Sequence, residues 1–102
     1  MPTAYLIVES NISDPEKFKA YMAAAPAVVK DFAGEYLVRG GRMAVLEGDW
    51  TPPRLTVLRY PSFEAAQKMY DSPAYRAARE LRAGATACFN RVLVEGVDAP
   101  PA

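Results

Sequence analysis

The sequence predicts one α+β domain with the element order β-α-β-β-α-β, in which an antiparallel sheet carries its helices on one face. Runs of β-branched and aromatic residues at 3–10, 54–60 and 87–95 indicate strands. Two segments between these runs repeat apolar residues at spacings of three and four, which is typical of helices that pack by one face. A length of 102 residues suits a single domain of modest core.

The first strand, residues 3–10, is a nearly continuous apolar run and is followed by helix-starting residues. Ser13 or Asp14 can cap a helix there, and Pro15 suits the first helical position, where an N–H would have no helical partner. Pro26 lies inside the same apolar periodicity. Because proline has no N–H to continue the helix, we expect a kink or a break at Pro26.

The segment between the first helix and the third strand is rich in glycine. Gly34, after Ala33, is expected to end the helix in the usual C-terminal manner. Residues 36–39 and 42–46 then predict a second strand with Gly40-Gly41 in its middle. A glycine pair inside a strand indicates a bulge, a tight bend or the close approach of another backbone.

The C-terminal half predicts a strand, an interrupted helix and a final strand. Residues 54–60 form the third strand, and Ser62 can cap the helix that follows. Ser72 and Pro73 should break this helix and restart it as cap and first residue. The last strand runs over about 87–95, so we expect one domain over residues 1–96 and a tail, 97–102, that is partly disordered or lies on a partner.

The strands are more apolar than a sheet with one wet face requires. Residues 6–8, 55–58 and 92–94 are apolar at nearly every position, whereas a sheet exposed on one face alternates apolar and polar residues. Since no further element is left to cover the second face, we expect a two-fold homodimer with sheets packed face to face. The charged strand residues should then be paired, lie at the rims or line a cavity: Glu9, Arg39, Arg59, Arg91 and Glu95.

Composition excludes several classes of function. Histidine is absent and Cys88 is the single cysteine, so zinc sites, histidine triads and histidine-ligated haem are not expected, and we predict neither metal nor other cofactor. Twelve basic residues balance twelve acidic ones, which argues against a nucleic-acid partner. No apolar run is long enough to span a bilayer, so we expect no membrane partner and a cytoplasmic protein.

Several short motifs occur in an order that is shared with a known family. They are Asp14-Pro15-Glu16, Tyr36-Leu37-Val38-Arg39-Gly40-Gly41, Leu46-Glu47-Gly48-Asp49-Trp50, Pro61-Ser62-Phe63-Glu64-Ala65-Ala66 and Tyr70-Asp71-Ser72-Pro73-Ala74-Tyr75. Up to about Gly96 the chain resembles the domain of unknown function 1330 family, in the dimeric α+β barrel superfamily with its ferredoxin-like fold. The resemblance implies a ligand cavity between the helices and the sheet, near the connection of the second and third strands. It implies no activity, because the superfamily includes cofactor-free monooxygenases, isomerases, haem enzymes and ligand-binding proteins.

The candidate site lies in the stretch from Arg39 to Arg54. These two arginines could hold a carboxylate or an enolate-like oxygen, since a guanidinium offers a rigid fork of donors. Arg39 and Glu47 are the candidate catalytic residues, with Glu47 as a general base if burial raises its pKa. Trp50 could form the wall beside a flat substrate.

A structural interpretation of the same stretch is also open. Arg39 could pair with Glu47 or Asp49 to hold the connection between strands, and Gly48 could supply a turn with positive φ. Trp50 could pack across the dimer boundary. In this interpretation the same groups stabilise a loop, although a group that holds a loop can also meet a ligand.

Tyr21, Tyr70 and Tyr75 lie on the expected helix faces, where they could direct hydroxyls into the cavity or simply belong to the core. With Tyr21 and Tyr70 as substrate-binding residues beside Trp50 and Arg54, the chain could be a cofactor-independent enzyme, monooxygenase- or isomerase-like, acting on a small aromatic or carbonyl compound. The alternatives are a homodimer that binds a small molecule without chemistry and a purely structural homodimer.

Overall fold

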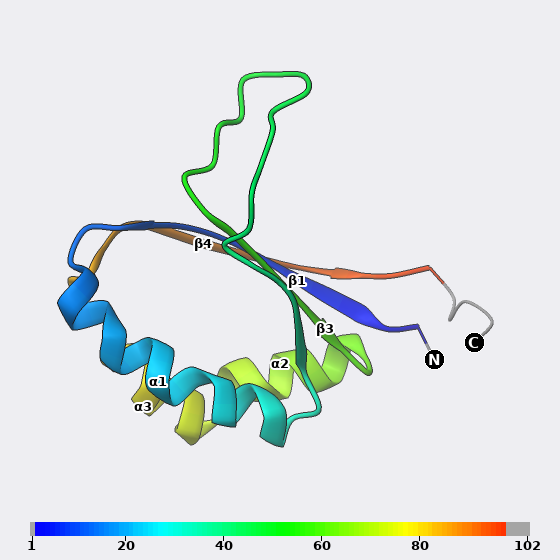
Figure 1. The fold of residues 1–102 in the computed structure, drawn as a ribbon. Coiled ribbons are helices and arrows are strands. Elements are labelled where there is room, and N and C mark those ends of the chain that lie inside the picture. The colour runs from blue at the N-terminus through cyan, green and yellow to red at the C-terminus, as the bar shows by residue number, and fades with distance from the viewer. Residues whose placement is uncertain (1, 98–102) are drawn as a thin grey trace.

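The computed structural model describes residues 2–97, whose elements follow the expected order (Figure 1). They are β1 (Ala4–Ile12), α1 (Pro15–Asp31), β2 (Glu35–Arg39), β3 (Leu55–Tyr60), α2 (Phe63–Asp71), α3 (Pro73–Glu80) and β4 (Thr86–Glu95). The strands form one antiparallel sheet in the order β2-β3-β1-β4, and the helices lie on one of its faces. The predicted α+β, ferredoxin-like fold is therefore confirmed. Of the predicted tail, residues 98–102 lie outside the described part of the chain.

Helix α1 begins as the sequence indicates but does not break at its proline. Asp14 is the N-cap and its Oδ1 accepts a hydrogen bond from the Lys17 N–H at 3.1 Å. The helix continues through Pro26 to Asp31, so the break that we considered there is wrong. Burial of its apolar face against the sheet outweighs the one helical hydrogen bond that proline removes. The bond that is missing leaves the carbonyl of Met22, four residues earlier, without its helical donor.

At the end of α1, the residue with the left-handed backbone conformation is not the expected glycine. Ala33, not Gly34, has a positive φ of 60°. A Cβ on Gly34 would lie 2.5 Å from Cε1 of Tyr60, whose side chain is fully buried. Glycine at this position is thus required for the close approach of the chain to the core, and the left-handed turn falls on the residue before it.

The second strand ends at Arg39, so the predicted strand over residues 42–46 is wrong. Gly40, with φ of 69°, donates its N–H to the Leu55 carbonyl at 2.9 Å, and the chain then leaves the sheet. Residues 41–53, which we call the arm, form no strand and project on the side of the sheet away from the helices (Figure 1). Gly48 has the positive φ predicted for a turn, 90°.

The two serines that precede the C-terminal helices are caps, as predicted. The Ser62 hydroxyl accepts a hydrogen bond from the Ala65 N–H at 3.1 Å at the start of α2. The Ser72 hydroxyl accepts one from the Tyr75 N–H at 3.1 Å and donates to the Met69 carbonyl at 2.7 Å, so it ends α2 and starts α3. This double cap turns α3 so that Tyr75 faces the core.

The inner face of the sheet and the helices enclose the core, while the outer face is apolar and uncovered in the single chain. Alternation along β1 buries Leu6 and Val8 beneath the helices and leaves Ile7, between them, on the outer face. Val92 and Val94 of β4 are 59% and 45% exposed there. Within residues 2–97, no helix or strand covers this face (Figure 1).

Candidate functional site

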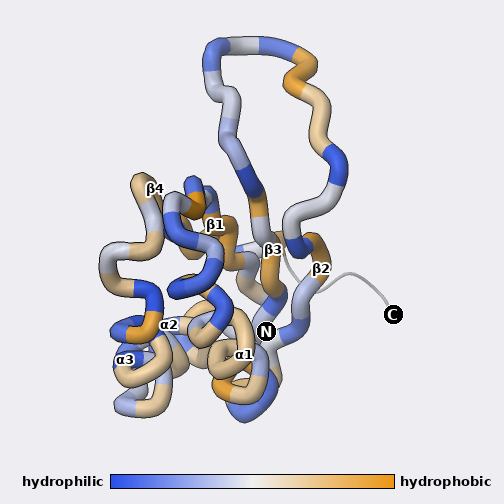
Figure 2. The backbone as a smooth tube through the Cα atoms, turned by 60° about the vertical axis from the view of Figure 1, so that its left-hand side comes forward, coloured by the Kyte–Doolittle hydropathy of each residue, from blue (hydrophilic) through white to orange (hydrophobic). Residues whose placement is uncertain are grey.

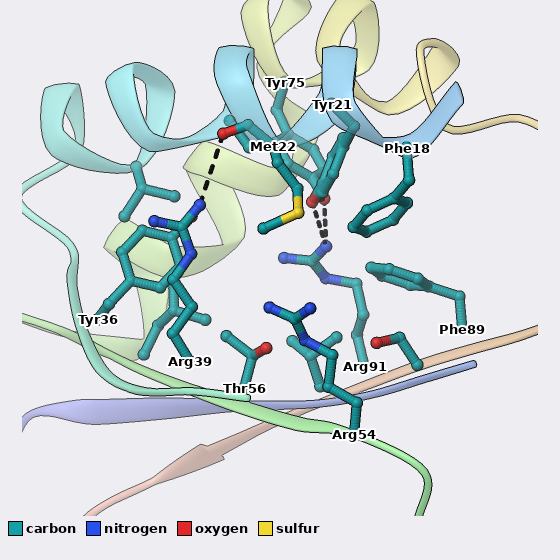
Figure 3. Close-up of a pocket in the computed structure, with 15 residues that line it drawn as sticks. Phe18, Tyr21, Met22, Tyr36, Arg39, Arg54, Thr56, Tyr75, Phe89 and Arg91 are labelled. Carbon is teal, nitrogen blue, oxygen red and sulfur yellow. Dashed lines mark hydrogen bonds between the residues drawn. The ribbon is translucent and has the colours of Figure 1, made fainter. Parts of the chain in front are cut away.

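A cavity lies between α1 and the inner face of the sheet (Figure 3). Its polar lining consists of three arginines, three tyrosines, a serine and a threonine: Arg39, Arg54, Arg91, Tyr21, Tyr36, Tyr75, Ser10 and Thr56. Phe18, Phe89 and aliphatic side chains complete the wall, and no carboxylate of residues 2–97 lines it. The volume that the centre of a water molecule can reach is about 50 Å³, several times the ~10–15 Å³ that one water requires.

Strand pairing brings the three arginines together from distant parts of the sequence. Arg91 of β4 is opposite Val8 of β1, a buried position, so its side chain points to the helix-covered side. Arg39 is opposite Thr56 at the end of β2, and Arg54 comes directly before β3. Their guanidinium groups point into the same space beneath α1 (Figure 3).

Arg91 belongs to a buried network with two tyrosines. The hydroxyls of Tyr21 and Tyr75 lie 2.6 Å apart and form a hydrogen bond. Nη1 of Arg91 donates to both, at 3.3 Å for Tyr21, and its Cζ lies 4.9 Å from the centre of the Tyr75 ring. Nε of Arg91 is buried and has no hydrogen-bond partner within the described residues. The network therefore fixes the guanidinium while leaving part of its donor capacity unused.

The tyrosines of the cavity are suited to donate hydrogen bonds. Burial raises the pKa of Tyr75 well above its usual range, although the nearby Arg91 acts in the opposite direction. Burial likewise raises the pKa of Tyr36, which Arg39 beside it partly offsets. Both phenols are accordingly protonated near neutral pH, so they can stabilise an oxyanion but cannot act there as bases.

Arg39 and Arg54 are positioned by features of the neighbouring backbone. Nη2 of Arg39 donates to the Met22 carbonyl at 3.5 Å, the group that Pro26 leaves without a helical donor. Its Cζ also lies 4.6 Å from the centre of the Tyr36 ring. A Cβ on Gly40 would lie 3.0 Å from Nε of Arg54, so the glycine leaves room for this guanidinium.

Neither of these two arginines forms an ion pair with a carboxylate of residues 2–97. The two ion pairs in that part of the chain are Lys19 with Glu16 and Arg59 with Glu35. The alternative in which Arg39 pairs with Glu47 or Asp49 is therefore not what the structure contains. Three guanidinium groups thus face a cavity to which the described part of the chain contributes no carboxylate.

The structure brings only part of the predicted site together. Arg39, Arg54 and Tyr21 line the cavity, whereas Tyr70 lines a neighbouring groove. Glu47 lies on the arm.

Trp50 also lies on the arm, and its Nε1 donates to Oε2 of Glu9 on the outer face of the sheet at 3.2 Å. Oε1 of the same carboxylate accepts from Asn90 at 3.0 Å. Trp50 therefore contacts the sheet on the side opposite the cavity. The functional roles assigned to the six residues stay predictions.

Arg91 and Tyr36 are site residues that sequence reasoning did not select. Arg91 was recognisable as a charged residue inside an apolar strand, for which a cavity was one of three expected locations. Its register with Val8 decides among them, and that register follows from strand pairing across the whole chain. Tyr75 was expected either in the core or at the site. It belongs to both, because its side chain is fully buried and its hydroxyl lies at the cavity.

The fold and the cavity define a ferredoxin-like α+β protein with an arginine-lined pocket beneath its helices. The sequence matches the family described as Domain of unknown function (DUF1330) over residues 3–97, and the chain belongs to that family. A search of the curated proteins finds no match to this sequence.

Solved structures that resemble the chain share its fold at low sequence identity. A protein of unknown function from Rhodopseudomonas palustris superposes with a TM-score of 0.76 at 19% identity, over 96% of this chain and 85% of that one. A dimeric ferredoxin-like protein of unknown function from Thermobifida fusca gives 0.59 at 15% identity, over 92% and 91%. A Nitrosomonas europaea protein proposed to be an antibiotic biosynthesis monooxygenase gives 0.57 at 18%, over 94% and 91%.

None of the helices within residues 2–97 is both long enough and apolar enough to span a membrane.

Proposed function

We propose that the chain forms a homodimer through the outer faces of two sheets and that each copy binds a small molecule bearing a carboxylate or an enolate-like oxygen. The observation that carries the proposal is the convergence of three arginines on a cavity without a lining carboxylate. An anionic ligand would supply the missing negative charge. A guanidinium binds a planar carboxylate through two parallel hydrogen bonds, which gives both affinity and orientation.

The size of the cavity limits what can enter it. A space of about 50 Å³ for water centres accommodates only a few heavy atoms. The ligand is therefore a small anion, or a larger molecule that inserts its charged end. Phe18 and Phe89 on the wall favour an apolar or aromatic body next to that charge.

Two observations support the homodimer. The outer face exposes apolar side chains of β4, and the arm exposes further ones, including Leu46 at 92%. In Figure 2, part of the arm has the colour of hydrophobic residues. Exposed apolar surface of this extent on a small domain is typical of an association site. The structural neighbour from Thermobifida fusca is described as dimeric.

The test uses butanoate as the probe and isothermal titration calorimetry as the measurement. Arg39→Gln and Arg54→Gln should each weaken butanoate binding at least ~10-fold, because each removes a charge-assisted hydrogen bond of about 1.5–3 kcal/mol. Arg76→Gln, an exposed position on α3 outside the cavity, is the matched control and should leave the affinity unchanged. Absence of saturable binding, or equal losses in the three variants, contradicts the proposal.

A second candidate is a cofactor-independent enzyme acting on a small aromatic or carbonyl compound. It is favoured by the Arg91 and Tyr75 pair, which could hold a developing oxyanion, and by the likeness to the Nitrosomonas europaea protein. Glu47, the base that the sequence predicts, lies on the arm and does not line the cavity, so in this candidate the arm would have to move to bring Glu47 to the ligand.

Deuterium exchange at C3 of phenylpyruvate, followed by NMR in D₂O, tests this chemistry. Glu47→Gln should slow the exchange at least ~10-fold while butanoate affinity stays constant. An exchange rate no higher than that in buffer would leave binding without catalysis.

A further inference from the structure

A groove adjoins the arginine cavity on the side of α2 and β4. Its apolar walls are Leu6 and Leu93 of the sheet and Phe63 and Ala66 of α2. The space that the centre of a water molecule can reach there is about 360 Å³, far larger than the cavity itself. The groove is therefore large enough for a chain of several carbons, which the cavity is not.

Arg91 lines both spaces and is the cation they share. On the cavity side its Nη1 is held by the hydroxyls of Tyr21 and Tyr75. On the groove side its Cζ lies 5.5 Å from the centre of the Tyr70 ring, which is 5.6 Å from that of Tyr75. A ligand bound to Arg91 thus lies at the boundary of a polar cavity and an apolar groove.

The remaining lining of the groove selects against a second negative charge. Asp71, at the end of α2, places a carboxylate at the groove, and Gln67 adds an uncharged polar group. A ligand with an anionic group at both ends would bring one of them near Asp71. A neutral apolar tail avoids this repulsion and buries surface against Phe63 and Leu93.

We propose that the ligand is an amphiphilic monocarboxylate whose carboxylate binds among the cavity arginines at Arg91 and whose unbranched or aromatic tail, about four to six carbons long, lies in the groove between α2 and β4. This inference rests on the proposed function, because it requires an anion in the cavity. It adds the class of ligand and assigns Tyr70 and the α2 face to tail recognition.

The test compares acetate, butanoate and hexanoate in the wild-type chain and in two variants of α2. Gln67→Trp places a bulky side chain over the groove from an exposed position. Lys68→Trp, the next exposed residue and not part of the groove lining, is the matched control. Calorimetry gives the affinities, and NMR of backbone amides shows where each ligand acts.

In the wild type, hexanoate should bind at least ~10-fold more tightly than acetate, since each fully buried methylene can contribute up to about fourfold. In Gln67→Trp this gain should fall below ~3-fold while acetate affinity is unchanged, and Lys68→Trp should behave as the wild type. Hexanoate, but not acetate, should shift the amide signals of Phe63 and Gln67.

Three results would overturn the inference and are distinguishable from one another. Equal affinities for acetate and hexanoate, with both weakened by Arg54→Gln, would refute the groove while the proposed function stands. A chain-length gain that persists in Gln67→Trp would place the tail elsewhere and also leaves that function intact. Absence of binding of every carboxylate would remove both together.

Discussion

The cavity and the arm are built by neighbouring residues of the sequence but lie on opposite sides of the sheet. Arg39 and Arg54 mark the two ends of the arm and direct their side chains into the cavity beneath α1. Between them, residues 41–53 project on the other side of the sheet (Figure 1) and expose Met43, Val45 and Leu46. One continuous stretch of sequence therefore contributes its ends to the cavity and its middle to an exposed surface.

This difference shows that residues close together in the sequence can have their side chains on opposite sides of a sheet. The cavity groups have partners within the chain, such as the hydrogen bond between Tyr21 and Tyr75. The apolar residues of the arm have few, since Leu46 is 92% exposed and Val45 50%. We therefore expect substitutions in the arm to change association, and substitutions at the cavity to change the stability and binding of each copy.

The largest effect is expected from charge placed on the arm. The double variant Val45→Asp/Leu46→Asp should raise the dimer dissociation constant at least ~100-fold, because burying two carboxylates in an apolar contact is costly. Sedimentation equilibrium should then give the mass of one chain. Butanoate affinity should stay the same.

Ala23→Asp/Ala27→Asp on the exposed side of α1 adds the same two charges and should leave the dimer intact. If the arm variant remains dimeric, or if the α1 variant dissociates equally, the arm does not form part of the interface. The contrast between arm and cavity would then lose its basis.

A smaller effect is expected from Tyr75→Phe at the cavity. The change removes the hydrogen bonds of the Tyr75 hydroxyl with Tyr21 and Arg91, and it should lower the free energy of unfolding by about 2 kcal/mol. Urea unfolding at fixed protein concentration measures this, and the dimer dissociation constant should not change. Tyr70→Phe, at a side chain that is 38% exposed, should cost less than about 0.5 kcal/mol. Equal losses in the two variants would contradict a special role for the buried network.

The smallest expected effect is the change in stability with pH that the buried tyrosine hydroxyls cause. Burial raises the pKa of Tyr75 and of Tyr60 in the folded chain. As the pH rises above about 10, the unfolded chain therefore loses these protons before the folded chain does. The contribution of these phenols to the free energy of unfolding is full at neutral pH and is lost as the pH rises further. The expected loss is at most about 1.4 kcal/mol per pH unit for each phenol.

Urea unfolding between about pH 8 and pH 11 measures that slope. Tyr75→Phe should make it shallower, because one of the phenols whose pKa burial raises no longer titrates. A stability that is independent of pH up to about 11, or a slope that Tyr75→Phe does not change, would show that the buried hydroxyls do not govern the alkaline limit.

Local sequence signals predicted the elements well because their causes are local. The caps at Asp14, Ser62 and Ser72 depend on a side chain that reaches an N–H three residues away. The same locality explains the errors. Pro26 removes a hydrogen bond within the helix, but the packing that keeps the helix continuous comes from the sheet.

The predicted site was recovered in part for a related reason. Arg39, Arg54 and Tyr21 line the cavity, whereas Glu47 and Trp50 lie on the arm. The two groups are separated because β2 ends at Arg39 and the chain leaves the sheet after Gly40. A glycine pair in a sequence is equally compatible with a bulge that would have kept the arm in the sheet.

The amino-acid sequence by itself determined the element order, the caps, the fold class and the apolar character of both sheet faces, because these depend on periodicity and on contacts over a few residues. Only the tertiary structure decided that Arg91 joins Arg39 and Arg54 around one cavity and that Tyr75 meets Tyr21. Strand register across the whole chain sets which side of the sheet each side chain occupies. A shift of one residue would send Arg91 to the opposite face.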